Sequence, residues 1–119
     1  MANRKKELSE FGVYLSGLID EAGMFKTDFY GSIGITRPYF YEILTGNPPP
    51  QETLEKMISY LEDKLGKDDK RRTKFFDLAA KCRDEIPVDI NDLIKAHPDK
   101  WSDIRDILLK HLNNHDEEN

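Results

Sequence analysis

Apolar side chains recur every three or four residues along most of this chain, and no segment alternates apolar and polar residues as a half-buried strand would. Helices are predicted over residues 8–22, 26–33, 37–44, 52–65, 73–84, 89–94 and 101–112. Glycine, proline and polar residues separate these segments, as turns between helices require. The pattern therefore predicts an all-α protein, and no internal repeat accompanies it.

The most specific local pattern lies between Gly34 and Gly46. Gly34 can adopt the left-handed conformation that ends a helix, and Thr36 offers a side-chain oxygen just before the next helical segment, as an N-cap does. An apolar stripe at i, i+3 and i+4 follows, formed by Phe40, Ile43 and Leu44. Gly46 and three prolines end this segment. A short, closely capped helix with outward-facing side chains is typical of a helix that enters the major groove of DNA.

The apolar and glycine positions around this stretch resemble the helix-turn-helix of the Xre/lambda-repressor-like family of bacterial and phage transcriptional regulators. The matching positions are Met24, Phe29, Ile33, Gly34, Ile35, Phe40, Ile43 and Gly46. The resemblance covers about the first half of the chain, a usual size for a small domain. It implies a five-helix lambda-repressor-like fold, with a helix-turn-helix DNA-binding domain over residues 1–66 and a short helical C-terminal extension over residues 67–119.

Two residues depart from the family's pattern. Tyr30 stands where the family usually has alanine, because the two helices of the motif approach each other closely there. A tyrosine requires either that these helices splay or that its ring turns outward. Phe25 stands where the family usually has serine, threonine or asparagine, which cap the first helix of the motif.

The resemblance implies that Arg37, Pro38 and Glu42 point toward DNA bases from the helix that begins near Arg37. An arginine can pair bidentately with a guanine edge, whereas Pro38 offers only an apolar contact such as one to a thymine methyl group. Glu42 could accept a hydrogen bond from cytosine N4, orient Arg37, or remain a solvated acid. Arg37 in turn could be solvated or paired with Glu42.

Five further residues are expected to meet the phosphate backbone rather than the bases. Lys26 and Thr27 begin a helix whose N-terminus can hold a phosphate. Thr36 can do the same from the next helix, and Asn47 follows that helix directly. Tyr41 carries a hydroxyl on the side of the helix away from the apolar stripe, so it is favoured as a phosphate ligand.

The charge balance argues against strong non-specific DNA binding. The net charge is −5, and Lys and Arg are outnumbered in both halves, by 7 to 10 over residues 1–66 and by 11 to 13 over residues 67–119. Most non-specific affinity comes from cations that meet phosphates, so any basic surface must be local. The candidates are Arg4-Lys5-Lys6, Lys26 with Arg37, and Lys70-Arg71-Arg72-Lys74.

Two functions therefore remain open. The first is a sequence-specific DNA-binding transcriptional regulator, with a repressor favoured and double-stranded DNA as the partner. The second is a protein-interaction module that keeps the helix-turn-helix scaffold, which the acidic balance, Pro38, Glu42 and the run Tyr39-Phe40-Tyr41 favour. A homodimer is also expected, because one short helix reads few base pairs, and the apolar stripe of the last helix could pair with its twin.

Other classes find little support in the sequence. It has no phosphate-binding loop, dinucleotide-binding glycine motif or catalytic triad, so no enzyme and no cofactor are expected. The single cysteine, Cys82, excludes an internal disulfide, and His111 with His115 lack a third firm metal ligand. Neither a signal peptide nor a transmembrane run is present, which makes the cytoplasm the expected location, with no membrane partner.

Overall fold

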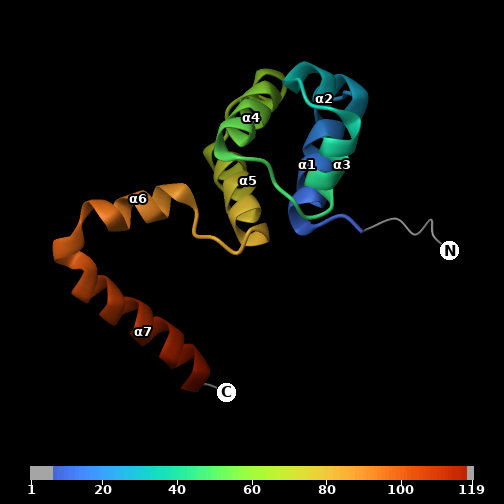
Figure 1. Ribbon diagram of the computed structural model, residues 1–119. Helices are drawn as coiled ribbons and strands as arrows, with labels where there is room; N and C mark the ends of the chain where they lie inside the picture. The colour runs from blue at the N-terminus through green and yellow to red at the C-terminus, as the bar shows by residue number, and fades with distance from the viewer. Residues whose placement is uncertain (1–6, 118–119) are drawn as a thin grey trace. The chain divides into compact units, whose positions relative to one another are not determined.

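The computed structural model describes the backbone of residues 7–117 and the side chains as far as Asn113, and all regular structure in this part is helical. The elements are α1 (Glu10–Glu21), α2 (Lys26–Ile33), α3 (Arg37–Leu44), α4 (Gln51–Leu65), α5 (Asp69–Cys82), α6 (Val88–Ala96), the short 3₁₀ helix η1 (Pro98–Lys100) and α7 (Trp101–Glu117) (Figure 1). The prediction of an all-α protein is thus confirmed. None of the helices in the described part is long and apolar enough to cross a bilayer.

Local capping explains where the helices agree with the predicted ranges and where they differ. Helices α2 and α3 have the predicted ends. Helix α5 begins before the predicted residue 73, because the carboxylate of Asp68 accepts hydrogen bonds from the backbone N–H groups of Lys70 (3.0 Å) and Arg71 (3.1 Å). The cap thereby extends the helix by residues 69–72, which the apolar pattern alone does not assign to it.

The chain divides into two compact units, one ending at Glu85 and the other beginning at Ile86. The predicted division after residue 66 would have placed α5 outside the first unit. Instead α5 packs on α1, with the fully buried ring of Phe75 centred 5.1 Å from that of Phe11. An ion pair of 2.8 Å between Lys81 and Glu10 joins the same two helices. The first unit therefore contains α1 to α5.

Helix α3 is held against α1 at an unusually close approach. The backbone N–H of Ser9, the N-cap of α1, donates to the carbonyl oxygen of Leu44 (2.9 Å), and the Ser9 hydroxyl donates to the same oxygen (3.2 Å). Gly12 permits this contact, because a Cβ at that position would stand 1.9 Å from the Leu44 oxygen. The two helices lie side by side in Figure 1. The glycine therefore fixes how α3 is seated.

The second unit consists of α6, η1 and α7. The indole N–H of Trp101 donates to the carbonyl oxygen of Ile94 (2.6 Å), which ties the start of α7 to the last turn of α6. No residue of this unit whose side chain is described is buried. Its apolar stripes, including that of α7, thus remain at least partly exposed.

Candidate nucleic-acid interface

The connection between α2 and α3 has the geometry that the sequence predicts. Gly34 ends α2 in the left-handed conformation, with a φ of 89°, and its N–H donates to the carbonyl oxygen of Tyr30 (3.0 Å). Two residues later, the Oγ1 of Thr36 accepts a hydrogen bond from the N–H of Tyr39 (3.3 Å) and caps α3. The predicted roles of Gly34 and Thr36 are confirmed.

One face of α3 is buried against α2. Phe40 is fully buried there, and the rings of Phe29 and Tyr30 lie 6.1 Å and 5.2 Å from its ring centre. Tyr30 is half-buried, so of the two expected alternatives the outward-turned ring is not found. Its ring instead lies tilted against Phe40, and an aromatic contact replaces the close approach that an alanine would allow.

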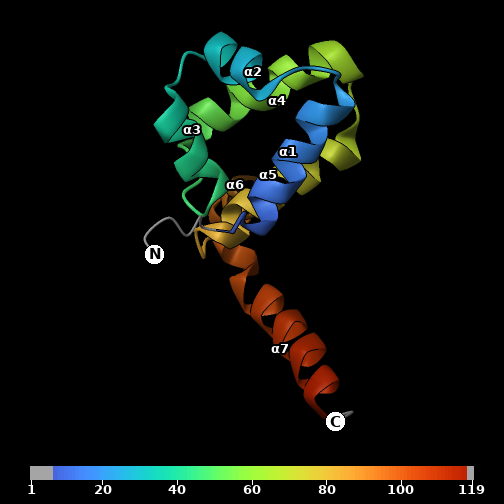
Figure 2. The ribbon, with the colours of Figure 1, turned by 90° about the vertical axis from the view of Figure 1, so that its right-hand side faces the viewer.

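Two side chains of α4 hold α2 in place from another direction. The Lys56 ammonium donates to the carbonyl oxygen of Ile33 (3.4 Å), at the last turn of α2. The Tyr60 hydroxyl donates to the Oγ of Ser32 (3.0 Å). Figure 2 shows α2 and α4 side by side. The α2–α3 pair is thus supported on α4 and α1.

The opposite face of α3 is exposed and carries the predicted base-contacting residues. Arg37, Pro38, Tyr41 and Glu42 are all exposed, and Tyr41 retains 41% of its accessible surface. The guanidinium carbon of Arg37 lies 5.7 Å from the ring centre of Tyr41, one helical turn further on. Arg37 therefore lies against Tyr41, whereas the sequence left open a solvated side chain or a pair with Glu42. A stacked guanidinium keeps the N–H donors along its edge available, which is the edge that pairs with guanine.

The residues expected to contact the phosphate backbone of DNA lie on α2, on α3 and in the loop that follows α3. Lys26 is half-buried and Thr27 exposed in the first turn of α2, where Phe25 provides no side-chain cap and is itself 78% exposed. Asn47 is exposed after α3, and its backbone N–H donates to the carbonyl oxygen of Glu42 (3.1 Å). Within residues 7–117, no hydrogen bond or ion pair joins Lys26 or Thr27 to α3.

The basic run in α5 is largely engaged inside the first unit. The guanidinium of Arg72 forms ion pairs with Glu55 (2.7 Å) and with the buried Glu62 (2.8 Å). Arg71 donates to a backbone carbonyl oxygen (2.9 Å), and the Lys74 ammonium lies 4.9 Å from an aromatic ring centre of α1. These contacts reduce the charge that the run offers to a phosphate. Arg4-Lys5-Lys6 lies outside the described residues.

One supporting residue was missed by sequence reasoning. The Arg83 guanidinium donates to the carbonyl oxygen of Pro48 (2.7 Å) and to that of Pro49, and both prolines are buried. Arg83 thereby holds the loop that leaves α3 against the end of α5. A proline-rich loop offers acceptors without N–H donors, but nothing in the sequence indicates which distant arginine fills them.

No metal centre is found in the described part, where no three His, Cys, Asp or Glu side chains come together. The side chains of His115 and Asp116 lie beyond Asn113, the last side chain described. Comparison with protein-family models, with curated proteins and with solved structures finds no significant match to this chain.

Proposed function

We propose that this protein is a sequence-specific DNA-binding regulator of transcription, that α2 and α3 form its helix-turn-helix, and that α3 enters the major groove. The observation that carries this proposal is the exposed face of α3. It presents Arg37, Pro38, Tyr41 and Glu42 from an eight-residue helix that is capped by Thr36 and seated on α1, α2 and the core. Helices that read bases in the major groove have this combination of rigidity and outward polar side chains.

In this proposal, Arg37 provides base recognition through its guanidinium edge. Its position over the Tyr41 ring limits the conformations of the long side chain, so less entropy is lost when it meets a guanine. Glu42 lies one residue beyond Tyr41 on the exposed face and accepts a hydrogen bond from cytosine N4. Pro38 contributes an apolar contact, for example to a thymine methyl group.

The phosphate contacts come from the first turns of the two helices. The N-terminus of α2 lacks a side-chain acceptor, so its first N–H groups are available to a phosphate oxygen, with Lys26 and Thr27 beside them. The Thr36 oxygen already accepts from Tyr39, but its hydroxyl proton is free to donate. Tyr41 and Asn47 complete the expected backbone contacts on the exposed side.

Selection of DNA sequences in vitro with the full chain tests the proposal directly. We expect a defined motif to be enriched, and binding to it to weaken with salt, since the phosphate contacts release counterions. Arg37→Lys is a matched variant, because it keeps the charge but loses bidentate pairing. It should relax the preference at one base pair more than it lowers non-specific affinity. A library from which no motif emerges at low salt would contradict the proposal.

The alternative is a protein-interaction module with the same scaffold. Two observations favour it. Arg71 and Arg72 of α5 are engaged in contacts within the first unit. Phe25, directly before α2, and Tyr41, in α3, remain exposed. Aromatic side chains of this kind are enriched at protein interfaces. Absence of DNA binding at low salt, together with saturable binding to a partner that Tyr41→Ala abolishes, would favour this alternative.

A further inference from the structure

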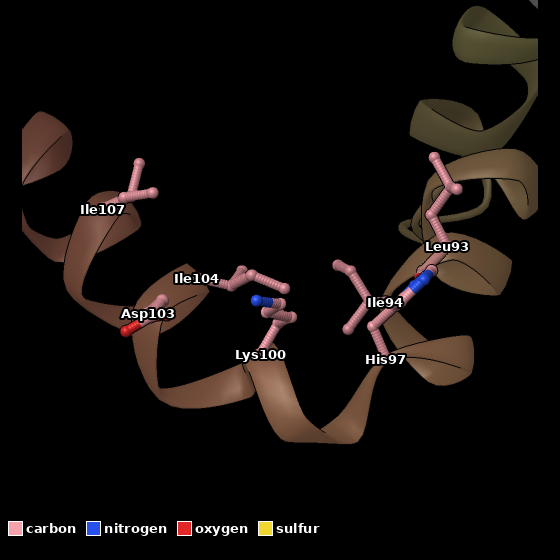
Figure 3. Close-up of a pocket in the computed structure, with 7 residues that line it drawn as sticks. All are labelled: Leu93, Ile94, His97, Lys100, Asp103, Ile104 and Ile107. Carbon is pink, nitrogen blue, oxygen red and sulfur yellow. The ribbon is translucent and has the colours of Figure 1, made fainter.

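An uncovered apolar groove lies on the second unit. It runs in the angle between α6 and α7 and is lined by Leu93, Ile94, His97, Lys100, Asp103, Ile104 and Ile107. Figure 3 shows Ile94, Lys100 and Ile104 converging on the centre of this groove, with Leu93 and Ile107 on its two flanks. The apolar stripes of two helices therefore face one common hollow.

We propose that this groove is a homodimer interface, in which the α6–α7 hairpin of one copy packs into the α6–α7 groove of a second copy. Two such hairpins related by a two-fold axis give a four-helix arrangement with the apolar side chains inside. This inference does not depend on the proposed function, since it concerns only the unit that begins at Ile86.

The first argument for a partner is that the unit has no core of its own. None of its described side chains is buried, although α6 and α7 are regular helices and Trp101 fixes their junction. A unit whose described side chains form no buried core usually needs a disulfide, a metal or association to hold its fold. The sequence offers no cysteine in this unit. Association remains as the means of covering its apolar faces.

The second argument is the size of the exposed apolar surface. Nine large apolar side chains of this unit are between 44% and 64% exposed. At roughly 200 Å² for each complete side chain, they present on the order of 900 Å² per copy. Among them only Leu93 and Ile107 line the groove, so the apolar area inside it is well below the about 800 Å² per partner of a standard interface. Since only part of this surface faces the groove, a concentration-dependent dimer is expected rather than a permanent one.

The third argument is charge, and it selects a second copy over an unrelated partner. The groove carries one cation, Lys100, and one anion, Asp103, and among the described residues neither takes part in an ion pair. A two-fold axis repeats every contact, so Lys100 of one copy meeting Asp103 of the other forms two ion pairs at once. The groove is thus complementary to itself in charge as well as in apolar character.

The first experiment measures the mass of the full chain by sedimentation over a wide range of concentrations. We expect a reversible monomer–dimer equilibrium, which Ile107→Asp weakens at least about tenfold, since a charge would be buried in the interface. Leu109→Asp is the matched control. Leu109 is 50% exposed on the same helix, but it follows Ile107 by two residues and so projects from another face. A wild-type chain that is monomeric throughout, or equal effects of both variants, would overturn the proposal.

The second experiment tests the charge pairs themselves. Lys100→Asp and Asp103→Lys each create like charges across the axis, so each variant alone should dimerise more weakly than the wild type. Mixing the two variants restores both pairs in the heterodimer, which should form in preference to either homodimer. Both positions are exposed, and circular dichroism checks that helix content is retained. Failure of the mixture to form heterodimers would overturn the arrangement, even if Ile107→Asp had lost its fold.

Discussion

Replacing Gly12 by alanine should destabilise the first unit, although alanine normally favours a helix. The added Cβ would stand 1.9 Å from the carbonyl oxygen of Leu44 and 2.8 Å from its carbonyl carbon. These are backbone atoms, so no side-chain rotation relieves the overlap. Alanine gains about 0.5–1 kcal/mol of helix propensity over glycine, whereas forcing an extra methyl group into a packed site costs about 1–3 kcal/mol.

Movement of α3 away from α1 adds to that cost. The Leu44 oxygen accepts both the N–H (2.9 Å) and the hydroxyl (3.2 Å) of Ser9, and a typical hydrogen bond contributes about 0.5–1.5 kcal/mol. We therefore expect Gly12→Ala to lower the free energy of unfolding by about 1–3 kcal/mol, as urea denaturation followed by circular dichroism would measure.

Gly17 provides the internal control for this prediction. It lies in the same helix, and a Cβ there would meet nothing within 4 Å. Gly17→Ala should therefore raise the free energy of unfolding by about 0.5–1 kcal/mol, so the two substitutions should have opposite signs. Equal stabilisation by both would refute the close approach of α1 and α3 and, with it, the seating of α3 described above.

Three further substitutions test other parts of the account. Lys26→Ala should weaken binding to specific and non-specific DNA alike and reduce the log–log salt slope by about one unit; an unchanged slope would remove this residue from the phosphate contacts. Arg72→Ala should lower the free energy of unfolding by about 1–3 kcal/mol, because it leaves the buried carboxylate of Glu62 without its partner, and adding Glu62→Gln should recover most of the loss. The Lys81 ammonium holds the pKa of Glu10 below its ordinary value, so the stabilisation from their ion pair is present above that ordinary value and is lost as the pH falls through the lowered one. NMR titration should show the pKa of Glu10 rising in Lys81→Ala, and no change would mean that the pair does not form.

The sequence predicted well those features that depend on neighbouring residues. The left-handed Gly34, the Thr36 cap and the stripe of α3 are local, and the structure has all of them where they were predicted. The first compact unit extends to Glu85 rather than to residue 66, since the contact of Phe75 with Phe11 joins residues far apart in sequence. The helix predicted over residues 89–94 is longer in the structure, where α6 begins at Val88 directly after Pro87 and ends at Ala96.

The candidate interface was predictable only in part for the same reason. The exposed positions of Arg37, Pro38 and Glu42 follow from the helical period once Phe40 is assigned to the core. The choice of Tyr41 over Glu42 as the neighbour of Arg37 depends on side-chain conformation, which the pattern does not specify. The contact of Arg83 with the proline loop joins two segments that the sequence gives no reason to pair.

The most direct test of the central claim is the affinity of the wild type and of Arg37→Ala for the DNA sequence that the wild type selects, measured at the same salt concentration. The account predicts that Arg37→Ala loses about 1–3 kcal/mol of binding to that sequence. Its affinity for unrelated DNA should fall only by the small amount that the loss of one positive charge near the phosphates causes, and it should unfold at the same urea concentration as the wild type. Equal affinities of the two proteins for the selected sequence would contradict the claim that α3 reads DNA through Arg37.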